Sequence, residues 1–195
     1  PNHAHRALTH IESRGLLTEL ITQNVDGLHA RAGSTRYIEL HGSLARVLCL
    51  DCGLRFSRDA VQDWIVTHNP GWQEVCQGAE IAPDGDMEIP EIPEDFAVPT
   101  CASCAGILKP DGVFFGENVP RHIVERAWKI LDEAQLLLVA GSSLTIYSGK
   151  RFVLGAKKRK IPVAMINIGP TGVDELVDLK IQAPCCEILG ALAEF

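Results

Sequence analysis

Four of the seven cysteines in this 195-residue sequence form two pairs in which two residues separate the thiols. The pairs are Cys49 with Cys52 and Cys101 with Cys104. Two such pairs can deliver four thiolates to the corners of a tetrahedron, the geometry that Zn²⁺ takes in structural sites. Because four thiolates leave no open coordination position, we expect one structural zinc ion rather than a catalytic one. A redox pair or unrelated buried thiols are the alternative interpretation.

Small and polar residues follow three apolar stretches of the sequence, at Thr22 to Gly27, Gly141 to Ser143 and Asn167 to Gly169. In parallel sheets, ligands bind beyond the carboxyl ends of the strands, so we expect these three loops to line one pocket. The segment Gly141 to Ser143 can bring backbone N–H groups and two hydroxyls close to a phosphate. The same tripeptide is also a common turn, and it indicates a phosphate site only together with the other loops.

His41 is the histidine whose position suits acid–base chemistry. It ends the stretch Tyr37 to Leu40 and precedes Gly42 and Ser43, which indicates the end of a strand opening into a flexible turn. An unperturbed imidazole titrates near neutral pH, so a histidine placed there can act as a general base. A packing role is the alternative.

The elements that must position these residues alternate along the chain. Apolar residues at helical spacing predict helices over residues 2–14, 121–134 and 147–158, the first with Asn2 as its N-cap and Gly15 as its end. Continuous apolar stretches predict strands over residues 16–22, 136–140 and 162–168, the last two buried on both faces. This alternation predicts an α/β fold with a doubly wound parallel sheet.

Residues 71–99 differ in composition from the rest of the chain. They contain eight acidic residues, four prolines and neither Lys nor Arg. We therefore predict an extended, solvated excursion with little regular structure between the two cysteine pairs.

The overall composition excludes several classes of protein. With 46% hydrophobic and 22% charged residues the chain is typical of a globular protein rather than a disordered one. A net charge of −7 argues against general nucleic-acid binding, and no apolar run reaches the roughly 18 to 20 residues that span a membrane. The first residue is Pro1, inside a predicted helix and without an initiator Met, which indicates a fragment or a processed form.

The ordered motifs of the chain resemble those of the sirtuins over essentially its whole length. Besides the cysteine pairs, the matching motifs are Thr22-Gln23-Asn24-Val25-Asp26-Gly27-Leu28-His29, Glu39-Leu40-His41-Gly42-Ser43, Lys109-Pro110, Phe114-Phe115-Gly116-Glu117, Gly141-Ser142-Ser143-Leu144 and Asn167-Ile168-Gly169-Pro170. The class II branch, which includes mitochondrial lipoamidases and ADP-ribosyltransferases and many bacterial members, is the most similar. The features that favour this branch are Val25, Cys49-Leu50-Asp51-Cys52, Ala82-Pro83-Asp84-Gly85-Asp86 and Tyr147-Ser148-Gly149.

The resemblance implies a domain organisation. It predicts a Rossmann-type NAD-binding domain over residues 1–45 and 113–195, with a small zinc-binding module inserted over residues 46–112. The family's Gly-Ala-Gly-x-Ser loop and cofactor-covering helix would lie upstream of Pro1. We therefore expect this chain to lack the first strand and its phosphate cradle, and to bind NAD⁺ weakly by itself.

The resemblance also implies an activity. It predicts an NAD-dependent protein-lysine deacylase that acts on acyl-lysine proteins or peptides and releases nicotinamide and O-acyl-ADP-ribose. Mono-ADP-ribosyl transfer to protein and a non-catalytic, zinc-stabilised protein-binding module are the alternatives. We expect a monomer that binds neither nucleic acid nor membrane, in the bacterial cytoplasm or the mitochondrial matrix.

Site residues follow from the resemblance position by position. His41 would be the base, and Cys49, Cys52, Cys101 and Cys104 would hold the zinc. The nicotinamide ribose and carboxamide would contact Gln23, Asn24 and Asp26, next to Val25. Phosphate and ribose would lie against Gly141, Ser142 and Ser143, the adenosine ribose against Asn167, Ile168 and Gly169, and the adenine near the backbone of Cys185. The acyl-lysine tunnel and a backbone edge for the substrate peptide would come from Val113, Phe114, Phe115, Gly116 and Glu117.

Overall fold

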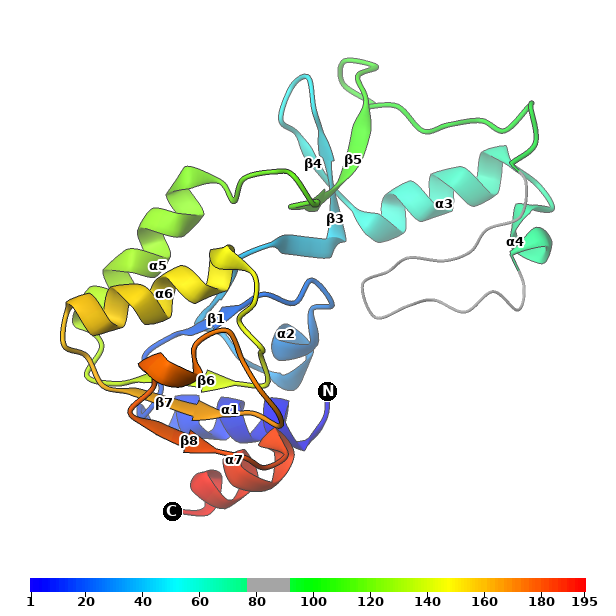
Figure 1. Ribbon diagram of the computed structural model, residues 1–195. Coiled ribbons are helices and arrows are strands. Elements are labelled where there is room, and N and C mark those ends of the chain that lie inside the picture. The colour runs from blue at the N-terminus through cyan, green and yellow to red at the C-terminus, as the bar shows by residue number, and fades with distance from the viewer. Residues whose placement is uncertain (77–91) are drawn as a thin grey trace. The chain divides into compact units, whose positions relative to one another are not determined.

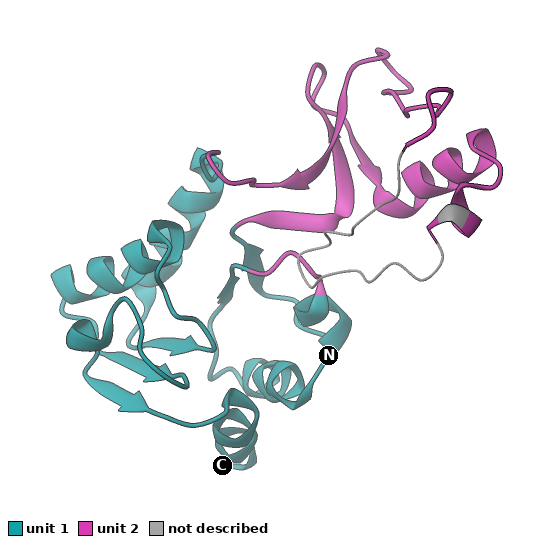
Figure 2. Cartoon of the chain, turned by 45° about the vertical axis from the view of Figure 1, so that its right-hand side comes forward, with its two compact units in different colours: residues 1–23, 28–40, 118–195 teal, residues 24–27, 41–117 magenta. Residues whose placement is uncertain are grey.

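The computed structural model in Figure 1 describes residues 1–76 and 92–195. The chain divides into two compact units, which Figure 2 shows in separate colours. One unit comprises residues 1–23, 28–40 and 118–195, and the other comprises residues 24–27 and 41–117. The segment 82–86 and most of the predicted acidic excursion lie outside the described residues. The assignment of NAD binding and zinc binding to separate domains stays a prediction.

The first unit contains helices and short parallel strands. Its elements are α1 (His3–Ser13), β1 (Leu20–Thr22), α2 (Leu28–Ala32), β2 (Tyr37–Glu39), α5 (Arg121–Glu133), β6 (Leu137–Ala140), α6 (Tyr147–Lys158), β7 (Val163–Ile166), the 3-10 helix η1 (Asp174–Leu176), β8 (Leu179–Ile181) and α7 (Cys185–Glu194). β1 pairs with β2, and β7 lies between β6 and β8; every one of these pairings is parallel. The predicted α/β class with parallel strands is confirmed.

Local signals account for the bounds of α1. The Asn2 side chain accepts a hydrogen bond from the His5 N–H at 3.1 Å, and the His5 side chain reaches back to the Asn2 backbone, which completes a capping box. The helix ends before Gly15, whose φ of 74° would strain any other residue. The predicted helix is confirmed, but the strand that follows begins at Leu20 rather than at Leu16, which is 67% exposed.

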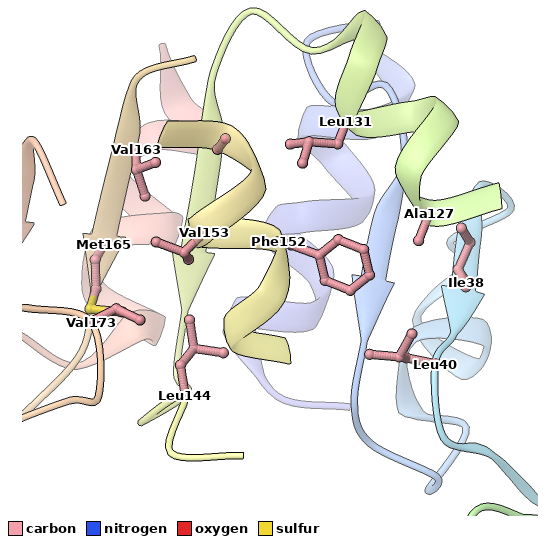
Figure 3. Packing of buried hydrophobic residues seen from close by; sticks show 11 residues of the cluster. Ile38, Leu40, Ala127, Leu131, Leu144, Phe152, Val153, Val163, Met165 and Val173 are labelled. Atoms are coloured by element: carbon pink, nitrogen blue, oxygen red, sulfur yellow. The ribbon is translucent and has the colours of Figure 1, made fainter. Parts of the chain in front are cut away.

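Alternate residues of β7 pack into two hydrophobic clusters. Val163 and Met165, both 0% exposed, belong to the cluster that α5 and α6 cover, part of which Figure 3 shows. Ile166 belongs to the other cluster, with Ala7 of α1 and Leu189 of α7. Since successive side chains of a strand point to opposite faces, helices cover both faces of this strand. Each large apolar side chain buried there stabilises the unit by about 1.5–3 kcal/mol.

The strand β6 is less buried than we predicted. It is an edge strand of its three-stranded sheet, and Leu136 and Leu138, just before it and within it, are 53% and 37% exposed. Leu137 and Val139, on the opposite face, pack against the first cluster, so one face of β6 is covered and the prediction that it is buried on both faces is wrong. The same prediction is confirmed for β7, where Met165 on one face and Ile166 on the other are 0% and 1% exposed.

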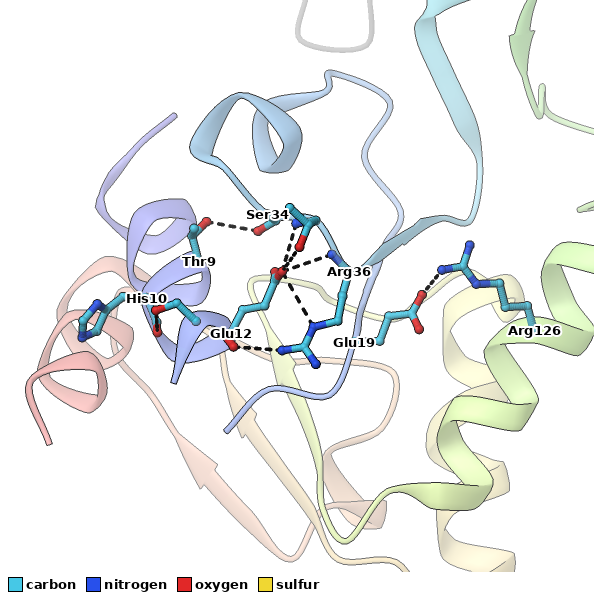
Figure 4. A network of polar contacts seen from close by, with 9 residues as sticks. Thr9, His10, Glu12, Glu19, Ser34, Arg36 and Arg126 are labelled. Atoms are coloured by element: carbon cyan, nitrogen blue, oxygen red, sulfur yellow. Dashed lines mark hydrogen bonds and ion pairs between the residues drawn. The ribbon is translucent and has the colours of Figure 1, made fainter. Parts of the chain in front are cut away.

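A buried carboxylate links the end of α1 to the start of β2 (Figure 4). Glu12 accepts hydrogen bonds from the Thr35 N–H at 2.9 Å, the Thr35 hydroxyl at 2.8 Å and the Arg36 N–H at 3.1 Å. Burial raises the pKa of Glu12, but these hydrogen bonds outweigh burial and hold it below the ordinary value. Because the Arg36 carbonyl accepts from the Leu20 N–H at 3.0 Å, the network also anchors the pairing of β1 with β2.

The second unit is built on an antiparallel sheet. Its elements are β3 (Gly42–Cys49), β4 (Arg55–Ser57), α3 (Arg58–His68), α4 (Trp72–Val75) and β5 (Leu108–Gly112), with the strands in the order β4-β3-β5. The helices α3 and α4 were not predicted, and α4 lies in the stretch expected to be extended. Ser57 caps the N-terminus of α3, because its hydroxyl accepts from the Ala60 N–H at 3.1 Å. Among the described residues, no helix is long and apolar enough to cross a membrane.

Candidate functional site

The four predicted zinc ligands lie together in the second unit. All four Sγ atoms are within 4.8 Å of one another, with 3.6 Å between Cys49 and Cys104 and 3.7 Å between Cys52 and Cys101. A tetrahedron with Zn–S bonds of about 2.3 Å has sulfur atoms about 3.8 Å apart. The side chains therefore fit one Zn²⁺ ion bound by four thiolates.

The two cysteine pairs adopt the same local turn. The Cys49 N–H donates to the Leu54 carbonyl at 2.9 Å, and the Cys49 carbonyl accepts from the Gly53 N–H at 3.0 Å. Cys101 makes the equivalent hydrogen bonds with Gly106, at 2.9 Å, and with Ala105, at 2.8 Å. The fourth residue after the first cysteine has a positive φ in both turns, 75° at Gly53 and 57° at Ala105. The repeated turn presents each pair of thiols in the same way.

The electrostatics of the cluster favour a bound cation. The Cys52 N–H, with other donors, lowers the pKa of Cys49 to about 7 even though burial opposes this. The Gly106 N–H lowers the pKa of Cys104, but the neighbouring sulfur atoms of Cys52 and Cys49 and burial outweigh it and raise that pKa to about 12. Four thiolates at this spacing repel one another, and a divalent cation removes the repulsion.

Asp51 is a residue of this site to which the sequence patterns assigned no role. Its carboxylate accepts a hydrogen bond from the Ile107 N–H at 3.1 Å, while the Ile107 carbonyl accepts from the Leu50 N–H at 2.9 Å. A Cβ on Gly106 would come within 2.1 Å of the same carboxylate. Asp51 thus ties the two cysteine turns together. The only sequence signal was an Asp between two cysteines, a residue type that often bonds nearby backbone N–H groups.

In the first unit, the structure brings together two of the three predicted loops at the ends of β1 and β6. The Gln23 side-chain amide donates to the Ser142 hydroxyl at 2.9 Å, and Ser142 also accepts from the Leu144 N–H at 3.3 Å. Gly149 of α6 packs beside them, since a Cβ there would lie 2.7 Å from the Gln23 Oε1 atom. Gln23 and Ser142, predicted to contact the same ligand, therefore contact each other.

The third loop and Cys185 lie beside the second loop. The Gly141 N–H donates to the Ile166 carbonyl at 3.0 Å, and the Cys185 thiol reaches the same carbonyl at 3.3 Å. Asn167 directly follows Ile166, and its side chain donates to the Ile168 carbonyl at 2.9 Å. Burial raises the pKa of Cys185, which makes its thiol a poor nucleophile. The thiol of Cys185 is therefore not expected to react, and the prediction that its backbone lies near the adenine stays a prediction.

The predicted base lies beside the predicted substrate loop in the second unit. The His41 carbonyl accepts from the Val113 N–H at 2.9 Å, and Gly42 is the register partner of Gly112. Gly42 has a φ of 82°, and a Cβ on it would lie 2.1 Å from the Asp111 carbonyl oxygen. No larger residue fits, so glycine is what allows β3 and β5 to hold His41 next to Val113.

The segment 24–27 also belongs to the second unit. The Val25 carbonyl accepts from the Leu44 N–H at 3.0 Å, and the Asn24 side-chain amide lies 3.5 Å from the Asp26 carboxylate. These contacts fix Asn24, Val25 and Asp26 on the start of β3. The prediction that they share one pocket with Ser142 and Asn167 of the first unit stays a prediction.

Substituting Gly42 by alanine tests the backbone contact beside His41. We expect Gly42→Ala to destabilise the protein by about 2–4 kcal/mol, because the left-handed backbone costs about 1–2 kcal/mol and the contact with Asp111 adds to it. Urea denaturation followed by circular dichroism measures the loss. Gly71→Ala is the matched control, because Gly71 has a φ of 86° and no atom of the described residues lies within 4 Å of where its Cβ would be. Equal losses in the two variants would contradict the argument.

The family model described as Sir2 family matches residues 1–148. The chain is 48% identical to NAD-dependent protein deacetylase 1 of Mycobacterium avium, over 100% of this chain and 70% of that protein. It is 50% identical to the human mitochondrial NAD-dependent protein lipoamidase sirtuin-4, over 97% of this chain and 60% of that protein.

A solved structure described as "Sir2-p53 peptide-NAD+" has the same fold, with a TM-score of 0.78 and 30% sequence identity over 100% of this chain and 69% of that one. This match confirms the predicted fold class. The chain spans between 60% and 70% of the length of the curated relatives named above.

Proposed function

The chain belongs to the Sir2 family, and from this membership we propose that the protein containing these residues is an NAD-dependent protein-lysine deacylase. The reaction would transfer the acyl group of a modified lysine to ADP-ribose, with release of nicotinamide and O-acyl-ADP-ribose. Identity of about half of the residues with a deacetylase and a lipoamidase, over nearly the whole chain, is the observation that carries the proposal.

We propose acyl-lysine proteins or peptides as the substrates. The similar solved structure contains a peptide and NAD⁺ according to its description. The loop 113–117 follows the edge strand β5 and carries Phe115, which is 97% exposed. A loop next to a sheet edge can receive an extended peptide through backbone hydrogen bonds.

The proposed roles in NAD⁺ binding agree with local contacts in the first unit. When bound, NAD⁺ would supply the ADP-ribose that accepts the acyl group. Gly141, with a φ of 65°, and the adjacent Ser142 and Ser143 would approach the phosphate and ribose through backbone N–H groups and hydroxyls. Gln23 would hold the nicotinamide end, since its side-chain amide already lies against Ser142. Asn167 and its neighbours would take the adenosine ribose.

His41 would act as the base that accepts a proton from a ribose hydroxyl. Its main chain is held on both sides, by the Val113 N–H and by the close packing of Gly42 on Asp111. A base in a fixed position loses little freedom when it reaches its target, which is the condition for efficient proton transfer. The zinc ion, enclosed by four thiolates, would stabilise the second unit and take no part in the chemistry.

We propose a monomer that binds no nucleic acid, in keeping with the net charge of −7. We propose the bacterial cytoplasm or the mitochondrial matrix as its compartment, because the compared relatives include a bacterial protein and a mitochondrial one.

Mass spectrometry of the products tests the proposed reaction. We expect that the full-length protein containing these residues, incubated with NAD⁺ and peptides carrying acetyl-, propionyl- or lipoyl-lysine, forms O-acyl-ADP-ribose and nicotinamide in equal amounts. A reaction without NAD⁺ is the control. Nicotinamide release with ADP-ribose attached to protein would identify a mono-ADP-ribosyltransferase instead. No nicotinamide release with any peptide would contradict both activities.

A further inference from the structure

The motif Lys109-Pro110 lies on β5 and has no role in the function proposed above. The Lys109 ammonium lies 2.5 Å from both carboxylate oxygens of Glu117, at the far end of the predicted substrate loop. The Lys109 side chain is 21% exposed and the Glu117 side chain 45%. Two hydrogen bonds from one ammonium to one carboxylate restrict both side chains more than a single contact would.

The same carboxylate also holds the main chain of the loop. The Phe114 N–H donates to Glu117 Oε2 at 2.9 Å, and the Lys109 ammonium lies 4.6 Å from the centre of the Phe114 ring, within the range of a cation–π contact. The hydrogen bonds from Lys109 and from the Phe114 N–H lower the pKa of Glu117, so the carboxylate is ionised at neutral pH. Lys109 therefore contacts the loop at two places, Phe114 and Glu117.

These contacts determine the shape of the loop. The Glu117 N–H donates to the Phe114 carbonyl at 3.0 Å, and Gly116 between them has a φ of 90°, which together make a tight turn. Both backbone polar groups of Phe114 are thus used within the loop. A substrate peptide that adds to this loop must pair with the backbone of the neighbouring residues, and those residues are presented only while the turn persists.

The residue before the turn is also hydrogen-bonded to the predicted base. Val113, directly before Phe114, donates its N–H to the His41 carbonyl at 2.9 Å. One short segment therefore connects the Lys109–Glu117 pair, the surface proposed to bind peptide, and the main chain of His41.

We propose that Lys109 is a positioning residue, which together with Glu117 clamps residues 113–117 in the conformation that receives the acyl-lysine peptide. This inference rests on the proposed deacylase function. Half-exposed ion pairs contribute little to global stability. The clamp is therefore expected to affect the conformation of the loop rather than global stability. A change in peptide affinity is the measurement that detects this effect.

Steady-state kinetics of Lys109→Met test the clamp in the active protein. We expect the KM for the acylated peptide to rise about tenfold, the change that corresponds to losing one charge-assisted hydrogen bond. The KM for NAD⁺ and the zinc content should change less than about twofold, because neither site contains Lys109. Lys109→Arg should restore most of the peptide affinity, since arginine also donates to a carboxylate through two N–H groups.

Lys157→Met is the matched control for the loss of a lysine charge. Lys157 pairs with Asp178 at 2.7 Å within the first unit, whereas the loop 113–117 belongs to the second. We expect its peptide KM to equal that of the unchanged protein. An unchanged peptide KM in Lys109→Met, or an equal rise in Lys157→Met, would overturn the proposal.

Hydrogen exchange at the Phe114 amide provides a readout that does not depend on activity. Lys109→Met and Glu117→Gln should both speed exchange at this amide by about tenfold. Each substitution weakens the hydrogen bond from the Phe114 N–H to the side chain of residue 117. Exchange in α5 and α6 should be unchanged. If the unchanged protein deacylates no peptide, the proposed function fails, while exchange at Phe114 still decides whether Lys109 holds the loop. Unchanged exchange in both variants would refute the clamp.

Discussion

Replacing His41 by alanine should lower the rate of acyl transfer to ADP-ribose by about 10²- to 10⁴-fold, the usual contribution of a positioned general base. The substitution removes the imidazole and leaves the main chain that the structure holds in place. The His41 carbonyl keeps its hydrogen bond from the Val113 N–H, and Gly42 keeps its contact with Asp111. The loss should therefore be chemical rather than structural.

Product formation followed by chromatography measures this effect, with circular dichroism and zinc content recorded on the same samples. His122→Ala is the control, because His122 is an exposed histidine at the start of α5. We expect it to retain full activity. Acyl transfer within about twofold of the unchanged rate in His41→Ala would show that another group is the base.

Removing one thiol from the cysteine cluster should abolish metal binding and unfold the second unit. Structural zinc contributes on the order of 10 kcal/mol to the folding of small metal-binding domains. The contacts that link the two cysteine turns directly, through Asp51 and the pairing of Leu50 with Ile107, are hydrogen bonds worth about 1 kcal/mol each. We therefore expect Cys101→Ser to lose bound zinc and the ordered signals of β3, β4 and β5.

Atomic emission for zinc and nuclear magnetic resonance for the fold measure the two effects. Cys76→Ser is the matched control, because Cys76 is not part of the four-thiol cluster, and it should keep one zinc ion per chain. Prolonged dialysis of the unchanged protein against a chelator should reproduce the Cys101→Ser result. A zinc-free protein that remains fully folded would rule out a structural role for the metal.

The parts of the fold that follow from local signals were predictable. α1, α5 and α6 carry apolar residues at helical spacing within one stretch of chain, and α1 has its cap at Asn2. The cluster at Cys49 and Cys101 was predictable for the same reason, because each pair forms one short turn whose sequence specifies its geometry.

Features that depend on distant partners could not be predicted in the same way. The hydrophobicity of the stretch before Ala140 indicates burial, but the actual exposure of Leu138 depends on which elements cover β6. α3 was missed because its buried face is narrow, with Val61 as its buried residue. The contacts of Asp51 with Ile107 and of Lys109 with Glu117 arise only once the strands are paired.

The candidate site combines both kinds of feature. The rule that ligands bind beyond the carboxyl ends of parallel strands led us to expect the loops after β1 and β6 in one pocket, and in the structure Gln23 of one donates to Ser142 of the other at 2.9 Å. No such rule concerns the close approach of Gly42 to Asp111, because that contact depends on the register between β3 and β5. Sequence patterns indicated which residues belong to the candidate site, and strand pairing determined which atoms those residues contact.

The interleaving of the two units in the chain limits how this protein can be dissected. An expression clone of residues 41–117 would contain the four zinc-binding thiols but would leave behind the segment 24–27. Leu44 would then lose the Val25 carbonyl to which its N–H donates at 3.0 Å. A graft that carries the metal-binding half into another scaffold must therefore supply a substitute for this short segment at the start of β3.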